Sequence, residues 1–152
     1  MVMKAELNFE TLKFTEVEGK IRATLLRFYY FDFGVSELGS DDFSVENGVL
    51  LANISQSKLD NKFNKILGKG LNELKCSLSS KPTIYLHQNS GMPLIGHNAF
   101  GIVDRNSTII EVKPLTGCNL NCVFCSVDEG KDSKKVADFV VEKDYMVQEV
   151  QK

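Results

Sequence analysis

The stretch CNLNCVFC, residues 118–125, decides how this chain is interpreted. It places Cys118, Cys122 and Cys125 in a C-x3-C-x2-C spacing, directly after the strand-like run 109–114. Cubic [4Fe-4S] clusters are ordinarily held by four cysteine thiolates. Three thiolates on one short loop leave the fourth iron without a protein ligand. The spacing therefore predicts a [4Fe-4S] cluster with one iron open to a small molecule.

The spacing resembles the cluster loop of the radical S-adenosylmethionine (radical SAM) superfamily, and the resemblance covers about residues 109–130. Asn119 follows the first cysteine and Phe124 precedes the third, as is common in that family. There the loop follows the first strand of a partial (β/α)6 barrel, and the open iron chelates S-adenosylmethionine. The cofactor is cleaved reductively to a 5′-deoxyadenosyl radical. The resemblance implies the three cysteines as metal ligands, Phe124 near the adenine, and a low-potential electron donor such as a ferredoxin or flavodoxin.

Other uses of these cysteines stay open from sequence alone. A structural zinc site would take a fourth ligand such as Cys76, His87 or His97, but only Cys122 and Cys125 form the C-x2-C pair that zinc sites usually repeat. A non-catalytic iron–sulfur module would want a fourth cysteine beside the other three, and Cys76 is remote in sequence. A disulfide would need an oxidising compartment.

Composition predicts a soluble, cytoplasmic protein with reduced thiols. The 152 residues carry 18 Lys and Arg against 20 Asp and Glu, a balance that indicates no nucleic-acid partner. No apolar run approaches the roughly 18 residues that read as a membrane span. The chain also begins without the basic and then apolar pattern of a secretory leader.

The residues before the cysteines predict an accessory α+β domain of unknown role over 1–108. Strands are expected early in it, where apolar and polar residues alternate. A helix is expected over 59–78, because leucines, Ile66 and Phe63 recur every three or four residues. Gly68 and Gly70 would weaken that helix. Cys76 would face away from its apolar stripe, as a peripheral free cysteine.

Residues 109–152 are expected to form the first βα unit of the α/β partial barrel, containing the cluster loop. Asp128 and Glu129 follow the last cysteine and are interpreted as solvated loop charges. The glycine-rich segment and later strands that bind the cofactor in the family have no counterpart before Lys152. The chain therefore resembles the N-terminal part of a longer enzyme, inactive alone; a natural truncation, a cloning boundary and a split enzyme all fit.

Overall fold

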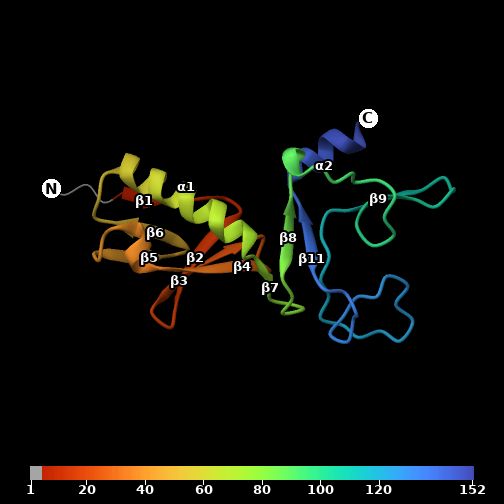
Figure 1. The fold of residues 1–152 in the computed structure, drawn as a ribbon, viewed down its shortest axis with the longest axis horizontal. Helices are drawn as coiled ribbons and strands as arrows, with labels where there is room; N and C mark the ends of the chain where they lie inside the picture. Colours follow the sequence, from red (N-terminus) through yellow and green to blue (C-terminus); the bar gives the residue numbers. More distant parts are fainter. Residues whose placement is uncertain (1–4) are drawn as a thin grey trace. The chain divides into compact units, whose positions relative to one another are not determined.

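A computed structural model describes residues 5–152 of the protein (Figure 1). The chain forms two compact units, Met1–Lys75 and Cys76–Lys152. The sequence placed the boundary at 108/109 instead. The difference arises because a strand at residues 83–86 pairs with one at 138–141, which joins the segment before the cysteines to the segment after them.

The first unit is built around two sheets. One has the order β1-β6-β5 and the other the order β2-β3-β4-β7. The strands are β1 (Ala5–Leu7), β2 (Leu12–Val17), β3 (Lys20–Leu25), β4 (Tyr29–Gly34), β5 (Phe43–Glu46), β6 (Val49–Ala52) and the two-residue β7 (Lys75–Cys76). A 3-10 turn, η1 (Val35–Leu38), follows β4.

Two tight hairpins set the register of these sheets. Glu18 and Gly19, between β2 and β3, have φ of 50° and 75°, and Asn47 and Gly48, between β5 and β6, have φ of 52° and 80°. Positive φ at both central residues is the geometry that matches the right-handed twist of paired strands.

Helix α1 (Gln56–Asn72) packs on β1 and β4 and buries Leu59, Phe63 and Ile66. The ring of Phe63 meets that of Phe14 edge-on, with ring centroids 5.4 Å apart. The helix is confirmed, but it ends six residues earlier than the sequence indicated. It also runs through both glycines without a break.

The second unit contains one parallel and one antiparallel strand pair. Its strands are β8 (Thr83–Leu86), β9 (Gly101–Asp104), β10 (Ile110–Lys113) and β11 (Asp138–Val141), with a short turn η2 (Gln88–Ser90) after β8. β11 runs parallel to β8, and β10 runs antiparallel to β9. The strand before the cysteines thus has an antiparallel neighbour, whereas the resemblance implies parallel neighbours there.

An apolar cluster holds this second unit together. Helix α2 (Lys143–Val150) follows β11 and contributes Tyr145 and Met146. The Tyr145 hydroxyl also donates to the Met92 carbonyl at 3.0 Å. The other buried members are Leu86, Leu94, Phe100, Ile102 and Val141. Within residues 5–152, the structure contains no helix with the length and apolar character needed to cross a membrane.

Candidate functional site: the three-cysteine loop

The three cysteines lie on an irregular loop, residues 117–130, between β10 and β11. The segment that leads into the loop is fastened to β11. The Thr116 amide donates to the Phe139 carbonyl at 2.9 Å, and the Val141 amide donates to the Pro114 carbonyl at 2.7 Å. The start of the loop is thereby fixed to β11.

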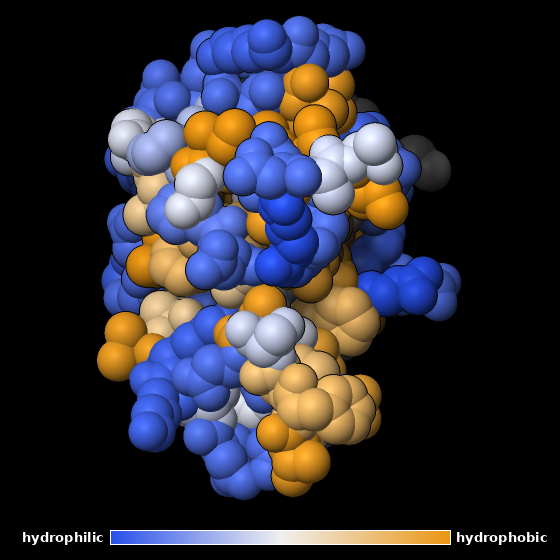
Figure 2. All heavy atoms as spheres, turned by 90° about the vertical axis from the view of Figure 1, so that its right-hand side faces the viewer, coloured by the Kyte–Doolittle hydropathy of each residue, from blue (hydrophilic) through white to orange (hydrophobic). Residues whose placement is uncertain are grey.

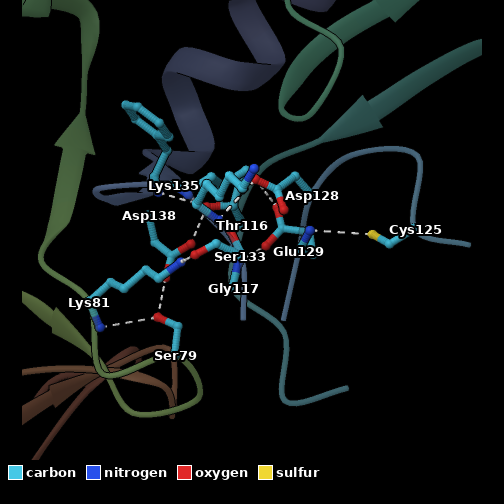
Figure 3. A network of polar contacts seen from close by, with 12 residues as sticks. Ser79, Lys81, Thr116, Gly117, Cys125, Asp128, Glu129, Ser133, Lys135 and Asp138 are labelled. Carbon is cyan, nitrogen blue, oxygen red and sulfur yellow. Dashed lines mark hydrogen bonds and ion pairs between the residues drawn. The ribbon is translucent and has the colours of Figure 1, made fainter. Parts of the chain in front are cut away.

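A buried carboxylate lies beneath this starting point. Asp138 is 1% exposed and accepts hydrogen bonds from the Thr116 hydroxyl, at 2.9 Å, and from the Ser79 hydroxyl. The Thr116 Oγ1 in turn accepts the Phe139 amide at 2.9 Å. Figure 3 shows Asp138, Thr116 and Ser79 gathered together. Because buried carboxylates are costly without partners, these contacts anchor the loop to the fold.

Two of the three cysteine sulfurs accept backbone amides. The Leu120 amide donates to Cys118 Sγ and the Glu129 amide to Cys125 Sγ, each at 3.3 Å. The amides of Glu129 and Val127 hold the pKa of the Cys125 thiol below its usual value. Cys118 and Cys125 are half-buried, whereas Cys122 is exposed. Amide donors of this kind stabilise thiolates, the form in which cysteine binds metal.

The donor set suits an iron–sulfur cluster in its chemistry: three thiols lie within eight residues, and two of them accept amides. The described conformation nevertheless gathers no three His, Cys, Asp or Glu side chains of residues 5–152 into a metal-holding group. Binding a cluster would therefore require the loop to close further around its three sulfurs.

Apolar side chains project from the same loop. Phe124 is 85% exposed, and Val123 and Leu120 are also exposed. Figure 2 shows apolar atoms gathered toward the lower end of its face, where Figure 1 draws the cysteine loop. Exposed apolar groups on a loop are available to stack on a ligand or to pack on another chain segment.

The alternative ligands considered from sequence are engaged elsewhere. His87 Nδ1 accepts the Asn89 amide at 3.3 Å. The His97 ring stacks on Phe100, with centroids 4.5 Å apart.

Cys76 is not the peripheral helix residue that the sequence predicted. It lies on β7, after the helix has ended, and is fully buried. A Cβ built on Gly117 would approach Cys76 Sγ to 2.8 Å, so this sulfur packs against the start of the loop.

Two polar residues of the site, Glu129 and Asp138, were misinterpreted or missed from sequence. Glu129 was expected to be a solvated charge, yet its side chain is only 15% exposed and pairs with Lys135. Asp138 was not recognised as a buried carboxylate of the site. The sequence signal that could have indicated it was its position at the start of the apolar run 138–141. Asp128 is exposed, as expected for a loop charge.

No protein-family model matches this chain, and no solved structure matches it. A curated relative is the uncharacterized protein MJ0103 of Methanocaldococcus jannaschii, which is 36% identical over 121 residues. The match covers 76% of this chain but only 28% of the relative. The chain therefore spans little more than a quarter of the length of this relative.

Proposed function

We propose that Cys118, Cys122 and Cys125 hold a [4Fe-4S] cluster, and that the chain is part of a radical SAM enzyme of the cytoplasm. The C-x3-C-x2-C spacing carries the proposal, since three thiols on one loop suit an open-iron cluster. Additional support comes from the amides directed at Cys118 and Cys125. S-adenosyl-L-methionine is the proposed second cofactor, and a ferredoxin or flavodoxin the proposed electron donor.

A bound cluster of this type supplies an open iron for the methionyl end of S-adenosylmethionine and the electron for its reductive cleavage. The residues of this chain would bind the cluster and orient the cofactor. The three thiolates fix the position of the metal, and the exposed ring of Phe124 offers a face on which adenine can stack. The remaining cofactor and substrate contacts are assigned to segments outside this chain, in keeping with the greater length of the relative.

Anaerobic reconstitution with iron and sulfide tests the proposal. We expect about four irons per chain, in a cluster that, once chemically reduced, gives an electron paramagnetic resonance spectrum that changes when S-adenosylmethionine is added. Each of the Cys118→Ser, Cys122→Ser and Cys125→Ser variants should lose the cluster. Cys76→Ala is the matched control and should keep the cluster. Alanine is chosen in place of serine because Cys76 is fully buried, and a buried hydroxyl without a hydrogen-bond partner would destabilise the fold.

Two results would contradict the proposal. Tight binding of one zinc per chain, with no uptake of iron, would favour a structural zinc site. Loss of the cluster in a folded Cys76→Ala chain would indicate four protein ligands and hence a closed cluster.

A further inference from the structure

Glu129 contacts both ends of the three-cysteine loop. Its Oε2 accepts the Gly117 amide at 3.3 Å, directly before the first cysteine. Its own amide donates to Cys125 Sγ at 3.3 Å. Its Oε1 pairs with Lys135 Nζ, and the two side chains are only 15% and 18% exposed. One residue thus joins the first and last parts of the cysteine segment (Figure 3).

Both ends of the loop are glycines with no room for a side chain. Gly117 and Gly130 have φ of 106° and 109°, values that disfavour any residue with a Cβ. A Cβ on Gly130 would lie 2.1 Å from the Leu120 carbonyl oxygen, and one on Gly117 would lie 2.8 Å from Cys76 Sγ. The backbone at both ends of the loop is therefore tightly packed, and a single hydrogen bond such as that from Gly117 to Glu129 can fix its position.

We infer that Glu129, with Lys135 as its counter-charge, is a positioning residue for the cysteine thiolates. The inference rests on the proposed cluster site and extends it. By accepting the Gly117 amide, the Glu129 carboxylate keeps the residue before Cys118 close to the segment after Cys125. Cys118 and Cys125 are thereby held on the two sides of the base of the loop. Lys135 offsets the negative charge that Glu129 would otherwise bring close to the thiolates. Partners that orient metal ligands in this way commonly alter metal affinity about 10- to 100-fold.

Three variants separate the contacts. Glu129→Ala removes both the acceptor for the Gly117 amide and the ion pair with Lys135. Glu129→Gln retains an acceptor but loses the charge. Asp128→Asn is the control, because it neutralises a neighbouring, exposed carboxylate of the same loop. Asparagine also tolerates the positive φ of 52° at that position.

Two measurements are made on each full 152-residue chain. The first is amide hydrogen exchange at Gly117 in the metal-free protein, by nuclear magnetic resonance. We expect exchange about fivefold to tenfold faster in Glu129→Ala, and unchanged in Asp128→Asn. The second is the rate at which a chelator removes iron from the reconstituted protein. We expect a rise of about tenfold or more in Glu129→Ala, a smaller rise in Glu129→Gln and none in Asp128→Asn.

The two measurements distinguish failure of the inference from failure of the proposed function. If wild-type protein takes up no iron, the proposed cluster site is wrong and the positioning role falls with it, while Gly117 exchange still decides whether Glu129 closes the loop. If wild-type protein takes up iron but Glu129→Ala and Asp128→Asn release it equally fast, the cluster site stands and the positioning role is overturned.

Discussion

The Thr116 hydroxyl donates to Asp138 at 2.9 Å, linking the residue before the cysteine loop to the first residue of β11. The same oxygen accepts the Phe139 amide. Thr116 is 4% exposed, so these bonds are made away from water. One hydroxyl therefore serves two groups on β11, and the Asp138 carboxylate has the Ser79 hydroxyl as a second donor.

Replacing Thr116 with valine should destabilise the second unit by about 1–3 kcal/mol, because Asp138 loses a donor and the Phe139 amide loses an acceptor. Urea unfolding followed by circular dichroism would measure the change. Thr108→Val, at an exposed position, is the control and should be nearly neutral. Equal stabilities for the two variants would argue against the anchoring role of Thr116.

The two glycines of α1 should respond to alanine with opposite signs. A Cβ at Gly68 meets no atom within 4 Å, so Gly68→Ala should stabilise the protein by about 1 kcal/mol through helix propensity. A Cβ at Gly70 would lie 2.3 Å from Cδ2 of the buried Phe31 ring, so Gly70→Ala should destabilise it by about 1–3 kcal/mol. Thermal unfolding of both variants against wild type decides this. Stabilisation by both would mean that Phe31 does not pack on the helix as described.

Cluster binding should order the middle of the cysteine loop. Because metal ligation is coupled to local folding, we expect hydrogen exchange across residues 115–135 to slow on reconstitution. The effect should be largest between Cys118 and Cys125. Helix α1 is an internal control whose exchange should not change. The same protection of the loop with and without metal would show that the thiols are already arranged.

Stability should also fall at high pH through Tyr85. Burial, followed by the nearby Glu142 carboxylate, raises the pKa of Tyr85 from 10.0 to about 12. A folded-state pKa above the unfolded one favours the neutral phenol. This stabilisation is complete below pH 10 and is lost as the pH rises toward 12. We expect wild-type protein to lose stability more steeply over that interval than Tyr85→Phe. Parallel pH profiles would contradict the pKa shift, and absorbance titration of the phenolate would check it directly.

Local patterns in the sequence predicted several elements correctly, and the limits of those patterns explain the errors. The spacing of Phe63 and its apolar neighbours predicted α1, but Leu74 continues the same spacing after the helix has ended at Asn72. Periodicity contains no stop signal there, because no glycine or proline follows Asn72 directly. Cys76 was consequently assigned to a helix face, whereas it is a buried strand residue.

The surroundings of the cysteines were beyond what spacing alone can predict. The motif identifies Cys118, Cys122 and Cys125 as candidate ligands from eight consecutive residues. Asp138 is buried and hydrogen-bonded to Ser79, which precedes β8, and to Thr116, which lies 22 residues before it in sequence. Glu129 lies in a polar stretch that suggests an exposed charge, and only the fold reveals its contact with Gly117. Long-range contacts of this kind leave no periodic signal along the chain.

The parallel pairing of β8 with β11 has a consequence for the order in which the protein assembles. Ser79 and Asp138, which meet beside this pair, are 59 residues apart in sequence. During synthesis the whole three-cysteine loop leaves the ribosome before β11 does. Distant pairings of this kind form slowly compared with hairpins. The nascent loop consequently passes through an interval in which its thiols are already synthesised but not yet anchored to β11.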